Sequence, residues 1–179
     1  EAEYNHVSGV LSAISGYADA SSASPRYSEV GSGQVRAREA VEIVYDPKII
    51  STNKILELYF RHIDPTDSGG QFGDRGYSYT TAIYYTTTNQ QIITNDIIAK
   101  ITTSKKFTDP VVTEVLPYTN FYPAEEYHQD YKDKNPVRYT TYREASGRNT
   151  FIRNNWSNDE KTKFIFYCNF NILFRPIKT

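Results

Sequence analysis

The sequence predicts an α+β fold, a two-layer sandwich of the ferredoxin-like split βαβ kind with helices over one face of a mixed or antiparallel sheet. Segments with the two-residue alternation of strands are interleaved with segments whose apolar residues have helical spacing. Their order is helix, strand, strand, helix, strand, helix, strand, which lacks only a first strand to complete two strand-helix-strand units. We therefore expect one sheet with its first strand missing from these 179 residues, which have the size of a single domain.

The N-terminal part of the chain predicts a strand between irregular segments. Residues 1–8 fit the end of a helix, and residues 9–17 alternate apolar and small side chains, as a strand in a crowded sheet does. A loop rich in Ser and Ala follows at residues 18–26. This segment therefore contributes one strand to the sheet.

The middle of the chain predicts two helices and two strands. A helix begins after Ser51 or Thr52, which can cap it, and ends near residue 62. A glycine-containing loop at residues 66–76 leads into a strand at residues 79–85, which are β-branched and aromatic. Two further elements follow, a helix at residues 88–101 and a strand at residues 111–116.

The C-terminal part of the chain shows little periodicity. Beyond Pro123 the sequence is polar and rich in tyrosine, so we expect a long irregular wrap over the domain with at most a short helix. We place the domain at residues 1–150 and treat residues 151–179 as an atypical C-terminal extension. No linker or internal repeat divides the chain.

Composition excludes several classes of protein. The formal net charge of -1 gives no basic surface, so we expect no nucleic-acid partner. No apolar run approaches the roughly 20 residues that cross a bilayer, so we expect no membrane segment. Cys168 is the single cysteine, which excludes a disulfide or a multi-cysteine zinc site within these residues. The sixteen tyrosines are expected to pack the core and interfaces.

Two segments have the composition of a binding site. The loop at residues 64–76 contains four glycines and three carboxylates, but its spacing fits neither a phosphate-binding loop nor a calcium loop. His128 lies among acidic residues at 125–130, which leaves a metal- or ligand-binding module as an alternative. We favour a hydrogen-bonded loop histidine, because no second histidine stands at ligand spacing. The chain has no G-x-S-x-G nucleophile elbow.

Glu39 interrupts the strand predicted at residues 37–45. We expect Glu39 and Glu42 on one face of this strand, with Val41, Ile43 and Tyr45 on the other. A carboxylate inside an apolar strand is unfavourable unless it is paired, and burial raises its pKa toward the range of a general acid. An edge or solvent-facing position accounts for Glu39 equally well. The pattern alone leaves both interpretations open.

Three sets of residues resemble blocks of the peptide methionine sulfoxide reductase A family. The second block of the family is matched by Pro25-Arg26-Tyr27-Ser28-Glu29-Val30, Ser32-Gly33, Glu39-Ala40-Val41 and Tyr45-Asp46-Pro47. The third is matched by Asp64-Pro65-Thr66, Gln71, Asp74, Gly76, Tyr79 and Ala82-Ile83-Tyr84-Tyr85. The fourth is matched by residues 121–131, Phe-Tyr-Pro-Ala-Glu-Glu-Tyr-His-Gln-Asp-Tyr. The blocks follow the family's order along residues 1–148.

The resemblance also implies where the nucleophile lies. The family's first block is Gly-Cys-Phe-Trp, followed shortly by a glutamate that Glu1 resembles. The cysteine is then expected about five residues before Glu1, and the missing first strand before that block. We therefore expect an N-terminal truncation that leaves the chain as given catalytically silent.

What the resemblance implies about chemistry is specific. The family's cysteine attacks the sulfur of methionine S-sulfoxide, free or in peptides, and becomes a sulfenic acid that an external thioredoxin-like thiol reduces, with no bound cofactor. By this resemblance Glu39 donates the proton, Tyr27 and Tyr79 bind the sulfoxide oxygen, and Asp74 orients the site. The substrate-binding residues are accordingly Glu39, Tyr27 and Tyr79, and no metal is expected.

Two segments depart from the family's pattern. The usual Gly-His-Ala-Glu is Arg36-Ala37-Arg38-Glu39 here, and the usual Tyr-Arg-Ser is Tyr79-Thr80-Thr81. We expect looser packing around Glu39 and Tyr79 as a result. Cys168, the one candidate for a resolving cysteine, lies in an apolar segment, which favours an inert cysteine.

The resemblance extends to partners. It implies oxidised proteins and peptides as substrates, a thioredoxin-like reductant and a monomer. The compartment is left open, with the bacterial cytoplasm favoured and the periplasm as the second choice. An inactive domain that only binds methionine sulfoxide is the alternative to an enzyme, and a metal or ligand module ranks after it.

Overall fold

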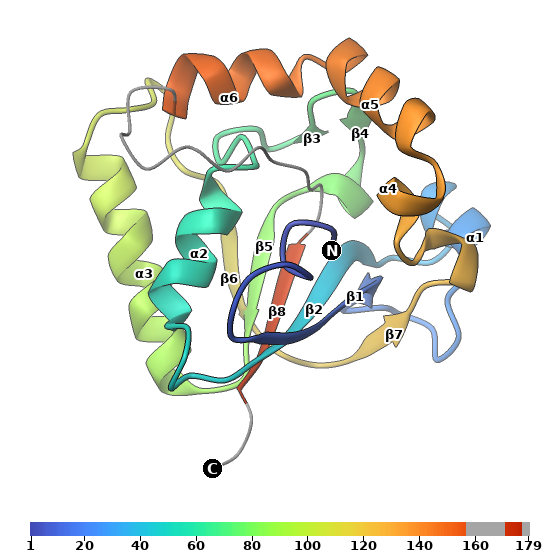
Figure 1. Cartoon of the computed structure of the whole chain (residues 1–179), viewed down its shortest axis with the longest axis horizontal. Helices are drawn as coiled ribbons and strands as arrows, with labels where there is room; N and C mark the ends of the chain where they lie inside the picture. The colour runs from blue at the N-terminus through green and yellow to red at the C-terminus, as the bar shows by residue number, and fades with distance from the viewer. Residues whose placement is uncertain (157–170, 177–179) are drawn as a thin grey trace.

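The computed structural model describes residues 1–156 and 171–176, which form a mixed sheet with helices around it (Figure 1). The sheet has the strand order β6-β5-β8-β2-β1-β7. Its strands are β1 (Val10–Ala18), β2 (Arg38–Tyr45), β5 (Ala82–Tyr85), β6 (Glu114–Pro117), β7 (Phe121–Pro123) and β8 (Asn171–Pro176). Two short strands, β3 (Gly70–Gln71) and β4 (Asp74–Arg75), pair separately.

The helices lie beside the sheet and across one end of it (Figure 1). They are α1 (Tyr27–Gly31), α2 (Thr52–Phe60), α3 (Thr88–Thr103), α4 (Tyr131–Lys134), α5 (Pro136–Ala145) and α6 (Arg148–Trp156), with 3-10 turns η1 (Tyr77–Tyr79) and η2 (Glu126–His128). Ser51 caps α2, as predicted, by accepting a hydrogen bond from the Lys54 amide at 3.2 Å. None of the described helices is long and apolar enough to cross a membrane.

The central strand of the sheet comes from the C-terminal part of the chain. β8 lies between β2 and β5 and runs parallel to both, whereas β1 is antiparallel to β2 and β7. A mixed fold around one sheet is thus confirmed, but the ferredoxin-like order and the missing first strand are not. The boundary at residue 150 stays a prediction, and Cys168 lies outside the described residues.

One face of the sheet packs on α2 and α3. Alternate side chains of β2, with Ile172 and Phe174 of β8, form a buried cluster with apolar residues of α2. The β2 members of this cluster are Val41, Ile43 and Tyr45. Strand side chains alternate between the two faces of a sheet, so Glu39 lies on the same face as Val41, Ile43 and Tyr45. Glu42 lies on the opposite face. The expectation that Glu39 and Glu42 share a face was wrong.

Three further expectations differ from the structure. Residues 1–8 form turns rather than a helix, and Tyr79 belongs to η1, because β5 begins only at Ala82. The segment beyond Pro123 is not an irregular wrap but contains three helices, α4 to α6. α5 escaped the sequence pattern because its buried residue is Arg143, and the buried stripe of α6 has only Ile152 and Trp156 beside Arg148.

Arg38 joins β2 to the segments that carry Tyr79. Its side chain is 2% exposed, and its guanidinium donates to the Thr80 hydroxyl at 2.9 Å and the Tyr84 hydroxyl at 3.2 Å. It also pairs with Glu114 of β6 at 2.9 Å and lies 4.4 Å from the ring centre of Tyr77. These contacts hold Arg38 in place, while the looser packing expected around Glu39 and Tyr79 stays a prediction.

Removing this side chain should destabilise the fold. Arg38→Ala leaves the buried Tyr84 hydroxyl without its donor and opens a cavity, so we expect unfolding to become easier by about 3 kcal/mol. Arg36→Ala is the matched control: Arg36 also lies over the Tyr77 ring, but its ion pair with Asp19 is solvent-exposed, so less than about 1 kcal/mol is expected. Urea denaturation measures both, and equal losses would contradict the role of Arg38.

Candidate active site

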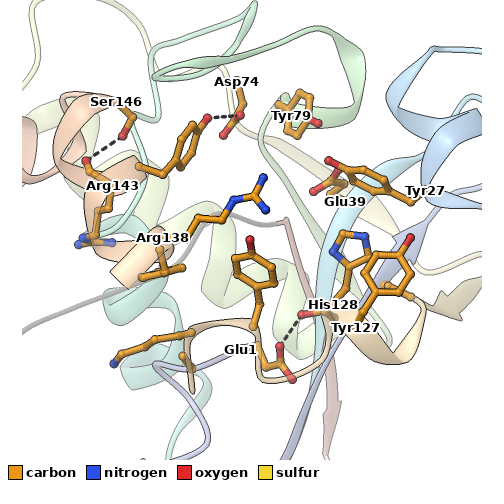
Figure 2. A pocket seen from close by; sticks show the side chains of 18 of the residues that line it. Glu1, Tyr27, Glu39, Asp74, Tyr79, Tyr127, His128, Arg138, Arg143 and Ser146 are labelled. Carbon is orange, nitrogen blue, oxygen red and sulfur yellow. Dashed lines mark hydrogen bonds between the residues drawn. The ribbon is translucent and has the colours of Figure 1, made fainter. Parts of the chain in front are cut away.

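A pocket of about 550 Å³ gathers all four site residues predicted from the sequence (Figure 2). They come from four separate elements: Tyr27 from α1, Glu39 from β2, Asp74 from β4 and Tyr79 from η1. The remaining wall is formed by β1, by the segment from 124 to 132, and by α5 with the start of α6. The structure thus places these residues together, while their catalytic roles stay predictions.

Glu39 lies near the start of β2, opposite Tyr17 of β1. Because β2 is an inner strand between β1 and β8, the alternative of an edge position for Glu39 is wrong. Burial raises the pKa of Glu39 to about 7; a hydrogen bond with Tyr79 opposes this rise, and the charge of Asp74 adds to it. Near neutral pH this carboxyl group can therefore hold a proton and release it.

Tyr27 and Tyr79 bring two hydroxyl groups to Glu39. In both Glu39 and Tyr27, burial outweighs hydrogen bonding by Tyr79, which lowers the pKa of each. Burial and the nearby Glu39 raise the pKa of both tyrosines, so both hydroxyls keep their protons at neutral pH. Gly76 allows the turn into η1 with its φ of 112°, a conformation that side chains disfavour.

The segment from 121 to 131 fixes the position of Tyr27. Glu125 accepts hydrogen bonds from the Tyr17 hydroxyl at 2.8 Å and from the Tyr27 amide at 3.0 Å. The Gln129 side chain binds both backbone groups of Ser15 in β1, with its amide group 2.9 Å from the carbonyl and its oxygen 3.0 Å from the amide. The family block seen in the sequence thus connects α1 to the sheet.

Asp74 connects the glycine-containing loop to α5. Its carboxylate accepts a hydrogen bond from the Tyr142 hydroxyl. The loop reaches this position through the pairing of β3 with β4, in which Gly70 has a φ of 149° and a Cβ would lie 2.2 Å from the Asp74 carbonyl oxygen. Glycine is required there because no side chain fits. The loop therefore places the carboxylate of Asp74 in the pocket.

His128 lies in the pocket wall between two aromatic rings. Its ring centre is 4.4 Å from that of Tyr27 and 4.3 Å from that of Tyr127. Burial lowers its pKa, although Glu125 opposes this, and its buried Nε2 has no hydrogen-bond partner in the described part of the chain. Among the described residues no three His, Cys, Asp or Glu side chains gather as metal ligands. The metal-module alternative has no support in this part of the chain.

Sequence reasoning missed the wall formed by α5. Arg138, Tyr139 and Tyr142 line the pocket, yet exposed Arg and Tyr residues on a helix carry no recognisable pattern. Seven of the sixteen tyrosines line the pocket, so the expectation that tyrosines serve mainly in packing was incomplete. Those seven are Tyr17, Tyr27, Tyr79, Tyr127, Tyr131, Tyr139 and Tyr142.

The arrangement can act on an oxygen atom bound beside Glu39. Two protonated tyrosine hydroxyls can donate hydrogen bonds to such an oxygen, and the carboxyl group of Glu39 can supply a proton. Donors that are held in place by the fold need little reorganisation during the reaction. The site therefore has the groups to help an oxygen leave as a hydroxyl.

The raised pKa of Glu39 makes stability depend on pH. The folded protein binds this proton more tightly than the unfolded chain, so its contribution is fully present below about pH 4.5 and is lost as pH rises through about 7. Glu39→Gln removes this dependence on pH. Between about pH 4.5 and 7, the free energy of unfolding of the variant should therefore rise relative to that of the original protein, by up to about 3 kcal/mol at 1.36 kcal/mol per pKa unit. Urea denaturation between pH 4 and 8 tests this, and parallel pH profiles for the two proteins would contradict it.

Comparison with known proteins assigns the family. The model of the family described as "Peptide methionine sulfoxide reductase" matches residues 1–160. The enzyme named peptide methionine sulfoxide reductase MsrA from Bacillus licheniformis is 49% identical over 83% of this chain and 82% of its own length, and MsrA from Bacillus pumilus is 46% identical over 83% and 84%.

The fold agrees with this assignment. The structure of reduced Mxr1 from Saccharomyces cerevisiae aligns with a TM-score of 0.66 and 31% identity over 72% of this chain and 74% of that one. Methionine sulfoxide reductase A of Corynebacterium diphtheriae gives the same TM-score at 29% identity, over 75% and 68%. Because the match covers most of the chain in both sequence and fold, this chain belongs to the peptide methionine sulfoxide reductase A family.

Proposed function

We propose that this protein reduces methionine S-sulfoxide, free or in peptides, to methionine at the pocket around Glu39. The observation that carries the proposal is the juxtaposition of Glu39, Tyr27 and Tyr79, since a sulfoxide oxygen there meets two hydrogen-bond donors and an acid with a pKa of about 7. The relatives that bear the name peptide methionine sulfoxide reductase support the same activity.

The proposed reaction transfers one oxygen atom to a cysteine. A thiolate attacks the sulfoxide sulfur and forms a sulfur–sulfur bond while Glu39 gives a proton to the oxygen. The hydroxyl then moves to the cysteine sulfur as the sulfur–sulfur bond and the bond from the methionine sulfur to oxygen break, which yields methionine and a cysteine sulfenic acid. The methionine sulfur gains two electrons and the cysteine sulfur loses two. Two thiol groups of a thioredoxin-like reductant then restore the cysteine, with release of water and formation of a disulfide.

The position of Glu1 supports an upstream nucleophile. Glu1 is 7% exposed, lines the pocket together with Ala2, and accepts hydrogen bonds from the Ser15 hydroxyl at 2.7 Å and the Asp130 amide at 3.0 Å. A segment that precedes Glu1 would therefore enter at the pocket wall. A cysteine about five residues before Glu1 would belong to that segment.

Turnover tests this proposal directly. A protein in which Gly-Cys-Phe-Trp and a two-residue connection precede Glu1 should reduce the S epimer of methionine sulfoxide with dithiothreitol as reductant, and should spare the R epimer. The same protein with serine in place of the added cysteine, and residues 1–179 alone, should be silent. If the extended, folded protein reduces neither epimer, the domain only binds methionine sulfoxide and the enzyme proposal fails.

Glu39→Gln in the extended protein tests the proton donor. We expect kcat/KM for methionine S-sulfoxide to fall at least tenfold, because general acid catalysis typically contributes about 10²–10⁴-fold. With Glu39 in place, activity should fall above about pH 7, where Glu39 loses its proton. Glu39→Gln should abolish this fall, because glutamine does not titrate. Glu57→Gln is the control, because Glu57 is half-exposed on α2 and pairs only with Lys54 in a surface contact. An unchanged rate for Glu39→Gln would remove Glu39 from the mechanism.

A further inference from the structure

The charged side chains of the pocket are divided between its walls. Three carboxylates line the pocket: Glu39 from β2, Asp74 from the glycine-containing loop, and Glu1, which accepts hydrogen bonds from the Ser15 hydroxyl and the Asp130 amide. Four cationic side chains line the wall from α4 to the start of α6: Lys132, Arg138, Arg143 and Arg148. The pocket therefore has a positive wall facing the group that would act on the sulfoxide.

Two of these cations serve the fold. Arg143 is buried and donates to the Asn149 side chain at 2.5 Å. Arg148 is also buried, with its guanidinium 4.4 Å from the ring centre of Phe72. Both connect α5 and α6 with neighbouring segments, so neither side chain can move to meet a ligand without breaking those contacts.

Arg138 differs from them. It is solvent-exposed on the first turn of α5 and makes no hydrogen bond or ion pair with any other residue that the structure describes. Its side chain extends toward the group formed by Tyr27, Glu39 and Tyr79 (Figure 2). It is not among the charges that shift the pKa of Glu39. Arg138 is thus a cation that lines the pocket but takes no part in tuning the proton donor.

The pocket has room for more than an oxidised methionine. Its volume of about 550 Å³ falls in the range of roughly 300–1,000 Å³ that holds drug-sized ligands, so a methionine side chain beside Glu39 leaves the part along α5 for its neighbours in a peptide. Arg138, Tyr139 and Tyr142 line that part. A guanidinium group matches the two oxygens of a carboxylate.

We propose that α5 forms a subsite for an acidic side chain next to the oxidised methionine, in which Arg138 selects peptides with Asp or Glu beside methionine sulfoxide. This inference rests on the proposed function, because it assumes that methionine sulfoxide occupies the end of the pocket at Glu39. Because its pKa is raised to about 7, Glu39 carries less than a full negative charge near neutral pH, which weakens its repulsion of such a peptide. Basic neighbours are disfavoured because they would meet the Arg138 cation.

Peptide binding to residues 1–179 tests the subsite without turnover. Four peptides, blocked at both ends so that only side chains carry charge, hold either methionine S-sulfoxide or methionine between two aspartates or two lysines. By calorimetry at low salt, the acidic sulfoxide peptide should bind about tenfold more tightly than the basic one. The preference should shrink to about twofold at 0.5 M salt, because salt screens partly exposed charges.

Arg138→Glu should reverse the order of the two sulfoxide peptides. Glutamate is favourable in the first turn of a helix, so the variant should fold. Lys48→Glu is the matched control, because it makes the same change of charge in the exposed turn after β2, at the other end of that strand from Glu39 and roughly 20 Å away. The control should keep the acidic preference.

The outcomes separate the two proposals. Equal affinity for acidic and basic sulfoxide peptides, or an acidic preference that survives Arg138→Glu, would overturn the subsite. Equal affinity for sulfoxide and methionine peptides would count against the proposed function, whatever the effect of charge. A reversed order in Arg138→Glu but not in Lys48→Glu supports the subsite.

Discussion

One buried guanidinium group holds together the segments on which the site depends. Arg38 precedes Glu39 in β2, and Thr80 follows Tyr79. The 2.9 Å hydrogen bond from Arg38 to the Thr80 hydroxyl therefore sets the distance between the backbone segments that carry Glu39 and Tyr79. The family's usual sequence has arginine where this chain has Thr80, and alanine where it has Arg38. The two departures meet in a single contact, in which the guanidinium comes from the opposite strand. This contact explains how both departures coexist with a compact site.

The site could be foreseen only in part. Glu39 was visible because a carboxylate in an apolar strand needs a physical reason, and burial supplies it. Tyr27, Tyr79 and Asp74 became visible only through their resemblance to family blocks, since nothing in their local pattern marks them. The contribution of α5 to the pocket wall could not be predicted from the sequence, because it depends on which face of the helix is directed toward the pocket. Long-range packing decides that orientation.

The fold was predictable where local pattern and burial agree. The strands β1 and β2 and the helices α2 and α3 have clear periodicity, and the structure places them within a few residues of the expected bounds. Periodicity failed at Tyr79, where a glycine turn shortens the strand, and beyond Pro123, where arginines occupy buried positions of α5 and α6. It also failed for β8, because a strand's place in a sheet is set by partners remote in the chain.

The place of β8 has a consequence for how the protein is made. Its pairing partners β2 and β5 leave the ribosome long before Asn171–Pro176 do, yet in the sheet each of them pairs with β8 and not with the other. Until then, the nascent chain exposes two unsatisfied strand edges, which invite pairing with other chains. A chaperone that shields these edges during translation would be expected to raise the yield of folded protein.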